Sequence, residues 1–296
     1  MNLENVTFCP ICSSTAFDDY IETSDFTTTG EYFKIVKCVG CQFLITSPRP
    51  TSGTISKYYQ SEKYISHTGG RRTIVDRIYL AARGLTLNWK YKLLSDYHNQ
   101  GAILDYGCGT GEFLHYLKQK NWTVHGVEPS EIARQKAIGL LDQEIASSLA
   151  DVPTNGFQVI TLWHVLEHIH ELNETIQLLT RLLHKNGTIF IAVPNYESAD
   201  AKQYQKHWAA YDVPRHLWHF SKETMNQLLQ RNGLNVRKIK PMRLDAFYVS
   251  MLSEGYKNPD QWKLAGLLKA IVAGIASNFA GAKKTNYSSL IYIVKK

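Results

Sequence analysis

An acidic residue followed by three alternating glycines is the segment of this chain with the most specific chemistry. Residues 105–111 read Asp-Tyr-Gly-Cys-Gly-Thr-Gly and follow a short apolar run. Glycines let the backbone turn sharply and let a ligand approach the amides, and the helix expected next offers unpaired N–H donors. The segment therefore predicts a polar ligand docked on the backbone. Its G-x-G-x-G spacing differs from the G-x-G-x-x-G of dinucleotide-binding folds.

Four histidines and one glutamate form a second group of residues that could take part in catalysis or metal binding. If the chain is helical after residue 163, His164, Glu167 and His168 share one face; His216 and His219 come from a later segment. Three roles are open for these side chains. They pack and orient a substrate, a histidine acts as general base because its unperturbed pKa is near 6.5, or they bind a divalent transition metal. His168 and His219 are the candidate bases.

Four of the five cysteines form two C-x-x-C pairs, namely Cys9, Cys12, Cys38 and Cys41, with 25 residues between the pairs. Two such knuckles bring four thiolates to one tetrahedral ion, which predicts a closed, structural zinc site. Redox pairs and disulfides are the alternatives. The N-terminal residues lack a basic region followed by an apolar run, so we expect a cytoplasmic, reducing location, which argues against disulfides.

Apolar strands and helices alternate from residue 101 onward, which predicts a parallel α/β sheet. Ligands of such sheets lie beyond the carboxyl ends of the strands, where Asp105, Glu128 and Trp163 fall. Glu128 stands seventeen positions after Gly111, and its carboxylate offers paired acceptors to the two hydroxyls of a ribose. Three loops are therefore expected to meet at one ligand.

The glycine turn, Glu128 and the segment 183–195 together resemble class I S-adenosylmethionine-dependent methyltransferases, over about residues 100–240. The resemblance implies a Rossmann-like, seven-stranded, mostly parallel sheet with helices on both faces. It also implies that Asp105 orients the turn and the methionine amino group. Two positions depart from the family pattern: the acid often found near the adenine amino group has no counterpart in Glu144-Ile-Ala-Ser-Ser148, and Gln158 replaces an aspartate. The residues implied to bind the cofactor are Asp105, Tyr106, Gly107, Cys108, Gly109, Gly111, Glu128, Pro129, Trp163 and His164.

The sequence predicts three parts: a zinc ribbon at 1–46, a helical linker or cap at 47–100, and the methyltransferase core at 101–296. Within the core, 245–286 is read as a helical insertion. Its stretch 264–281 is strongly apolar but interrupted by one lysine and three glycines, so we expect no membrane span. A lid over the substrate mouth, a dimer contact and peripheral attachment to a membrane are the roles considered for it, in that order.

The composition is that of a folded protein, with 44% hydrophobic and 20% charged residues, and the net charge is +7. The zinc ribbon followed by this core resembles bacterial methyltransferases of sugar or secondary metabolism. We therefore expect methyl transfer to an oxygen of a small molecule. The alternatives are a ribosomal or transfer RNA methyltransferase that contacts RNA with its ribbon, and a non-catalytic cofactor-binding module. If a metal is bound near Glu167 and His168, the pattern is similar to small-RNA 2′-O-methyltransferases and ubiquinone-pathway O-methyltransferases.

Overall fold

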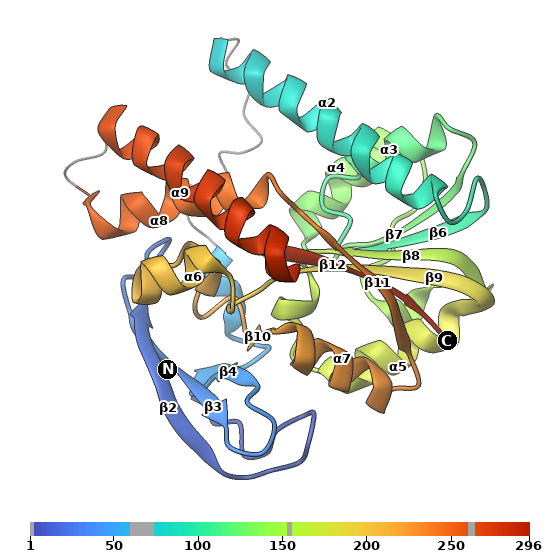
Figure 1. Cartoon of the computed structure of the whole chain (residues 1–296). Helices are drawn as coiled ribbons and strands as arrows, with labels where there is room; N and C mark the ends of the chain where they lie inside the picture. The colour runs from blue at the N-terminus through green and yellow to red at the C-terminus, as the bar shows by residue number, and fades with distance from the viewer. Residues whose placement is uncertain (1–2, 60–73, 153–155, 260–263) are drawn as a thin grey trace. The chain divides into compact units, whose positions relative to one another are not determined.

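A computed structural model describes residues 3–59, 74–152, 156–259 and 264–296 (Figure 1). The chain divides into two compact units, each formed by segments that are distant in sequence. The first unit contains Met1–Ile65, His164–Asn173 and Ile191–Ile293, and the second contains Ser66–Trp163, Glu174–Phe190 and Val294–Lys296. The predicted linker at 47–100 includes residues 60–73, which lie outside the described part of the chain.

Strands and helices alternate along the second unit, as the apolar pattern predicts. Its elements begin with a long helix, and two strand–helix pairs and a further strand follow. The bounds are α2 Ile74–Ser95, β6 Ala102–Tyr106, α3 Glu112–Lys118, β7 Thr123–Val127, α4 Glu131–Leu141, η3 Leu149–Asp151 and β8 Phe157–Trp163; α5 Leu172–Leu182 and β9 Leu183–Pro194 come next. Helix α2 runs without interruption through Gly84.

The larger sheet has six strands in the described residues, in the order β11-β12-β9-β8-β6-β7. Strand β6 pairs in parallel with both β7 and β8. The sequence predicted seven strands, and the missing one is reduced to a single parallel bridge between Val127 and Ala146. The chain leaves the sheet just after Ala146, because the hydroxyls of Ser147 and Ser148 both donate to the Asp151 carboxylate and fold this segment into a short turn.

The first unit contains a smaller, four-stranded sheet in the order β10-β4-β3-β2. Strands β2 (Phe17–Ser24), β3 (Tyr32–Cys38) and β4 (Leu44–Thr46) belong to the predicted ribbon, and β10 (Trp218–His219) comes from far along the chain. Ile35 and Leu44 are fully buried in one apolar cluster with Tyr58, Trp208 and Val213. The sheet that carries the cysteines thus shares its core with the histidine-containing segment.

Helices α6 (Ala199–Tyr204), α8 (Asp245–Lys257) and α9 (Leu264–Lys284) pack together in the first unit, and α8 and α9 lie side by side (Figure 1). Among the described residues, α9 is the one helix long and apolar enough to cross a membrane, and 28% of that window is buried. The predicted insertion is therefore helical. The remaining elements of this unit are β1 Leu3–Glu4, β5 Arg49–Pro50, η1 Ile55–Tyr59, η4 Leu166–His168, η5 Gln205–His207, η6 Ala209–Tyr211, α7 Lys222–Arg231, β11 Asn235–Pro241 and β12 Ser289–Lys295.

Candidate functional site

The glycine turn follows β6, and three of its residues have a backbone conformation that favours glycine. Gly107, Gly109 and Gly111 have φ values of 75°, 57° and 80°. The amide of Gly109 donates to Glu128 Oε2 at 2.8 Å. A Cβ added at Gly109 would meet no atom within 4 Å, whereas one at Gly111 would press on Ala137. The backbone at Gly109 is thus open to a ligand, and Gly111 is required for close packing of α3 against α4.

Asp105 lies at the end of β6 and is 3% exposed. Its carboxylate accepts a hydrogen bond of 2.5 Å from the Thr161 hydroxyl on β8. Burial raises the pKa of Asp105 to about 6, although the hydrogen bond from Thr161 and the charge of Lys90 oppose that shift. A buried carboxylate with spare lone pairs at a sheet edge is suited to hold an ammonium group. The sequence did not single out Thr161, although it lies two residues before Trp163.

Glu128 is half-buried after β7, and both of its carboxylate oxygens accept backbone amides. Oε2 accepts from Gly109 and Oε1 accepts from Ser130 at 2.9 Å. This orients the carboxylate beside the glycine turn and leaves lone pairs for further donors such as ribose hydroxyls. Pro129 is exposed next to it.

A cavity lies beside the carboxyl end of β7, with both polar and apolar walls. Its lining residues are His125, Gly126, Arg134, Glu144, Ile145, Ala146, Ser147, Asp151 and Val152. The cavity has two acidic residues in its lining, Glu144 and, from outside the segment 144–148, Asp151. The Asp151 carboxylate lies 2.9 Å from the Ser148 hydroxyl. It was missed because a short 3-10 turn, which has no periodic signal, brings it back to the serines.

Trp163 and Cys108 complete the predicted cofactor side. The indole of Trp163 packs edge-on against Phe113, and the Lys90 ammonium lies 4.3 Å from the indole ring centroid. Its Nε1 is buried and has no hydrogen-bond partner among the described residues. Burial raises the pKa of the Cys108 thiol, so this cysteine is an inert packing residue. Burial also raises the pKa of Tyr106.

His164 departs from the helix predicted for 164–168. Its φ is 56°, and a short 3-10 turn, η4, follows at Leu166–His168. The imidazole is held by two carboxylates: Nε2 lies 2.9 Å from Asp245 Oδ2, and Nδ1 lies 3.3 Å from Glu167 Oε1. Burial lowers the pKa of His164, but Asp245 and Glu167 outweigh it and raise the pKa to about 10. The side chain is a cation at neutral pH and is therefore unsuited to act as a base.

Glu167, His168 and His216, which we call the histidine–carboxylate cluster, come together in the first unit. One carboxylate oxygen and one nitrogen of each imidazole all lie within 4.8 Å of one another. The His168 and His216 rings meet edge to face, with centroids 4.6 Å apart. The backbone amide of Leu217 donates to the Glu167 carbonyl at 2.8 Å, which fixes the two segments together.

In both histidines of this cluster, Nδ1 donates a hydrogen bond to a backbone carbonyl. His168 Nδ1 lies 3.0 Å from Arg215 O, and His216 Nδ1 lies 2.9 Å from Ala210 O. A carbonyl only accepts, so each Nδ1 carries the proton and the lone pair of the neutral ring is on Nε2. The Tyr59 hydroxyl lies 3.0 Å from the same His168 nitrogen. Burial and the charge of His216 lower the pKa of His168 to about 4, so its ring is neutral at pH 7.

His219, the other candidate base, lies on β10 and is 4% exposed. The Thr46 hydroxyl donates to the His216 carbonyl at 2.7 Å, so it accepts from His219 Nε2 at 3.0 Å. Burial lowers the pKa of His219 well below its usual value. Its Nε2 therefore carries the proton, whereas in the neutral rings of His168 and His216 the proton is on Nδ1.

A buried arginine supports the loop that carries His216. Arg215 has a side-chain exposure of 1%, and its guanidinium bonds Asp212 twice, at 2.9 and 2.6 Å, and Asp25 once, at 2.9 Å. It also donates to the Tyr58 carbonyl at 2.9 Å. Burial raises the pKa of Asp212, but Arg215 outweighs this and the net shift is downward. Sequence reasoning missed Arg215 and Asp25, which are 190 residues apart.

The four ribbon cysteines converge as predicted. Their Sγ atoms all lie within 4.8 Å of one another, and the pairs Cys9–Cys41 and Cys12–Cys38 are each separated by 3.4 Å. None forms a disulfide. Burial raises the pKa of Cys9 to about 11, and backbone hydrogen bonds from Cys12 and Ile11 oppose that shift. The arrangement is suited to one tetrahedral metal ion.

We expect His164 to make stability depend on pH in the alkaline range. Its pKa is about 10 in the folded chain against 6.5 as the reference, so the folded state binds this proton more tightly. The contribution of its ion pairs is therefore fully present below about pH 6.5 and is lost as the pH rises through 10. The difference in Tm between the wild type and His164→Gln should shrink over that window. A difference that stays constant from pH 6 to 10 would contradict the assignment; His184→Gln is the control.

A methyltransferase-domain family model matches residues 77–239, more than half of the chain. The chain therefore belongs to this family and is a class I S-adenosylmethionine-dependent methyltransferase. It is 29% identical over 161 residues to an uncharacterized methyltransferase of Bacillus thuringiensis, with 49% of this chain and 75% of the relative covered. A Geobacillus methyltransferase, also uncharacterized, is 26% identical over 150 residues, with 46% and 70% covered.

Two solved structures are similar to this chain. One provisionally assigned as a sarcosine dimethylglycine methyltransferase, from Galdieria sulphuraria, is similar with a TM-score of 0.50 and 16% identity over 71% of this chain and 85% of that one. Magnesium protoporphyrin IX methyltransferase from Synechocystis, with S-adenosylhomocysteine bound, has a TM-score of 0.48 and 18% identity, with 64% and 92% covered. The predicted fold class is confirmed.

Gly109→Ala is expected to weaken S-adenosylmethionine binding at least tenfold, about 1.4 kcal/mol, while stability falls by only about 1 kcal/mol. The added methyl meets no atom of the chain, so it projects into the space we assign to the ligand. Gly233→Ala is the matched control, because Gly233 also has a positive φ of 73° and open space around its Cβ position. Calorimetric titration measures the affinity. Equal affinities in both variants would show that the ligand lies elsewhere.

Proposed function

We propose that this enzyme transfers a methyl group from S-adenosylmethionine to a hydroxyl oxygen of a small molecule, of the sugar or secondary-metabolite class. The observation that carries the proposal is the buried histidine–carboxylate cluster, which begins four residues after the end of β8. Glu167 is fully buried, and His216 is 8% exposed. A hydroxyl acceptor needs a group that takes its proton, whereas an amine acceptor is nucleophilic without one.

We assign the cofactor to residues of the second unit. In this proposal Asp105 holds an ammonium group, Glu128 holds a ribose, and the open backbone at Gly109 contacts the part of the ligand between them. When bound, S-adenosylmethionine supplies an electrophilic methyl group on a sulfonium. The roles of Tyr106, Cys108, Pro129 and Trp163 in this site stay predictions.

In the first unit, His168 is the residue we assign to the acceptor proton. Its Nδ1–H is held by the Arg215 carbonyl, which fixes the ring and leaves Nε2 with the lone pair. Because the pKa of about 4 keeps the ring neutral at pH 7, Nε2 is able to accept a hydrogen bond from an acceptor hydroxyl and to receive its proton as the methyl is transferred. His164, a cation held by Glu167 and Asp245, is a positioning residue in this scheme.

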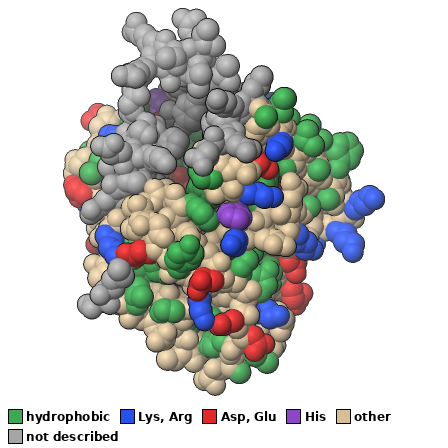
Figure 2. Space-filling model, turned by 90° about the vertical axis from the view of Figure 1, so that its left-hand side faces the viewer, with side chains coloured by type: hydrophobic (Ala, Val, Ile, Leu, Met, Phe, Trp, Pro, Cys, Tyr) green, Lys and Arg blue, Asp and Glu red, His purple; other side chains and the backbone are tan. Residues whose placement is uncertain are grey.

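An RNA acceptor is the second candidate, and charge argues against it. Residues 1–46 contain six carboxylates and two lysines, so the ribbon that would contact RNA is acidic despite the net charge of +7 of the chain. Figure 2 shows basic and acidic side chains intermixed among the described residues of one face. A basic patch or stripe is the usual electrostatic footprint of a nucleic-acid site.

We also propose that the four cysteines hold a structural zinc ion. Four thiolates fill all positions of a tetrahedral ion, so the site leaves none for a substrate. The ion would connect the segment before β2, which carries Cys9 and Cys12, with the end of β3 and the turn after it, which carry Cys38 and Cys41, at the same end of this antiparallel pair.

The acceptor is tested by incubating the protein with labelled S-adenosylmethionine and either small-metabolite extracts or total RNA. We expect label in the metabolite fraction, reduced at least about 100-fold in His168→Asn, since general acid–base groups contribute 10²–10⁴-fold. His184→Asn, a histidine outside the cluster, should keep the wild-type rate. Label in RNA alone would replace the proposal with the second candidate, and label in neither would favour a non-catalytic binding module.

A further inference from the structure

One oxygen of a completely buried carboxylate has no visible partner in the first unit. Glu167 has a side-chain exposure of 0%, and its Oε1 lies near His164 Nδ1. Its Oε2 has no hydrogen-bond partner among the described residues. A buried carboxylate oxygen without a donor is energetically costly, and such atoms in native proteins commonly mark a bound ion or water.

The two imidazoles that cluster with this carboxylate have the protonation pattern of metal ligands. In the neutral rings, His168 and His216 each donate Nδ1–H to a backbone carbonyl, which leaves the lone pair on Nε2; His216 Nε2 also lies 3.9 Å from Asp212 Oδ2. A hydrogen bond from the far nitrogen to a carbonyl or carboxylate is what metal-bound histidines normally have. Three potential ligand atoms, one from each residue, lie within 4.8 Å of one another.

We propose that Glu167, His168 and His216 bind a divalent transition-metal ion, of which zinc is the type we expect. Two imidazole nitrogens and one carboxylate oxygen are the ligand set of open zinc sites, whereas magnesium takes oxygen ligands almost exclusively. Three protein ligands leave a further position for an exogenous oxygen. This distinguishes the site from the closed group of four cysteines.

The surrounding residues give this ligand set a rigid support. His164, itself held by Asp245 at 2.9 Å, orients the Glu167 carboxylate from the side away from the metal. Arg215, whose carbonyl holds His168, is fixed by Asp25 and Asp212. The next step rests on the proposed function. If the acceptor is a hydroxyl compound, its oxygen would occupy the open position of the metal ion and be acidified there. With the metal bound, His168 Nε2 would be a ligand, so the base role assigned to it under the proposed function would apply only to the protein without this metal.

The test uses cobalt as the probe in the full-length protein whose cysteine site has first been filled with zinc. We expect one further equivalent of Co²⁺ to bind, with a visible d–d absorption and without the ultraviolet thiolate-to-cobalt charge-transfer band. Glu167→Gln and His216→Asn should each weaken this binding at least about 100-fold, more than loss of an outer-shell partner. His184→Asn should bind like the wild type.

Each result of this titration decides the inference. Cobalt uptake that is lost in both cluster variants, while thermal unfolding stays cooperative, supports it. If a variant fails to fold, His168→Asn provides a third ligand deletion with the same expectation. Uptake that is unchanged in the variants, or that occurs only with the thiolate band, overturns it. No acceptor takes part, so failure here is separate from failure of the acceptor screen.

Discussion

Arg215→Met is expected to lower the free energy of unfolding by about 3–5 kcal/mol, because it leaves two carboxylates without their cation. Asp25 is completely buried, so its charge cannot be hydrated once the guanidinium is removed. It still accepts amide hydrogen bonds from Thr27, Thr28 and Thr29, which hold it in place. Denaturant unfolding monitored by circular dichroism measures the loss.

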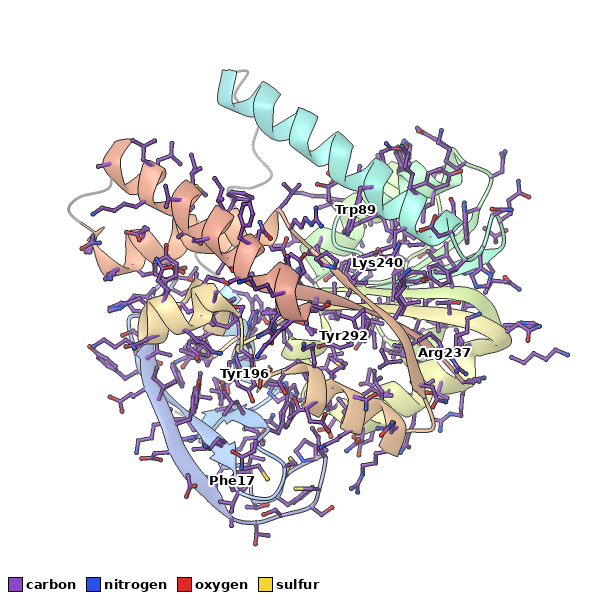
Figure 3. The ribbon with its side chains drawn as sticks, viewed as in Figure 1. Phe17, Trp89, Tyr196, Arg237, Lys240 and Tyr292 are labelled. Atoms are coloured by element: carbon purple, nitrogen blue, oxygen red, sulfur yellow. The ribbon has the colours of Figure 1, made fainter. Side chains whose placement is uncertain are left out.

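Arg237→Met is the matched control for this effect, since Arg237 is exposed on β11 (Figure 3). It should change the unfolding free energy by no more than about 0.5 kcal/mol. Arg215→Lys should give an intermediate loss, because lysine keeps the charge but lacks the planar fork that bonds Asp212 twice. A stability for Arg215→Met equal to that of Arg237→Met would contradict a supporting role for the buried arginine.

The cofactor side of this protein could be predicted from the sequence because its features are local. The positive φ values of Gly107, Gly109 and Gly111 follow from three glycines within five residues. Glu128 could be placed because a short helix and then a strand of regular length, α3 and β7, lie between it and the turn. Its hydrogen bond to the Gly109 amide is the geometric consequence of two parallel strands that end at the same edge.

The sequence indicated which histidines and glutamate could come together, but it did not predict their backbone conformation or their long-range contacts. The i, i+3, i+4 spacing of His164, Glu167 and His168 suggested a helix, yet His164 has a left-handed backbone and η4 is a single 3-10 turn. The bond from His164 to Asp245 joins residues 81 apart, and no periodicity reports such a pair. Long-range pairs of buried charges depend on the tertiary fold, so a single sequence does not reveal them.

The ribbon illustrates the same limit at the level of a domain. The C-x-x-C spacing predicted the meeting of four thiols, because each pair is a local knuckle. The spacing did not reveal that β10 extends the ribbon sheet, with Trp218 opposite Ile45. Buried side chains on both segments, among them Ile35 and Trp208, explain the association.

Cys38→Ser is expected to release the zinc ion that we propose for the four cysteines and to lower Tm by about 10 °C. A ligand at 1,000 times its Kd stabilises the folded chain by about 4 kcal/mol, and 1 kcal/mol corresponds to about 2–4 °C in a chain of 150–250 residues. Metal content by plasma mass spectrometry and thermal unfolding measure the two effects. Cys108→Ser is the matched control, because Cys108 is a buried cysteine outside the four.

The ribbon sheet shares an apolar core with other segments of the first unit, so we expect the loss of stability in Cys38→Ser to be confined to one part of the ribbon. Ile35 and Leu44 remain packed against Tyr58 and Trp208 without any metal, so the apolar end of the ribbon sheet should stay folded. The knuckles depend on turn hydrogen bonds such as those from Ser13 N–H to the Cys9 carbonyl and from Gln42 N–H to the Cys38 carbonyl, whose donor residues are exposed. Hydrogen exchange in Cys38→Ser should therefore accelerate at the two knuckles and remain slow in β3 and β4. Uniform acceleration across the ribbon would mean that the metal, and not the shared core, holds the whole sheet together; unchanged zinc content would contradict the four-cysteine site itself.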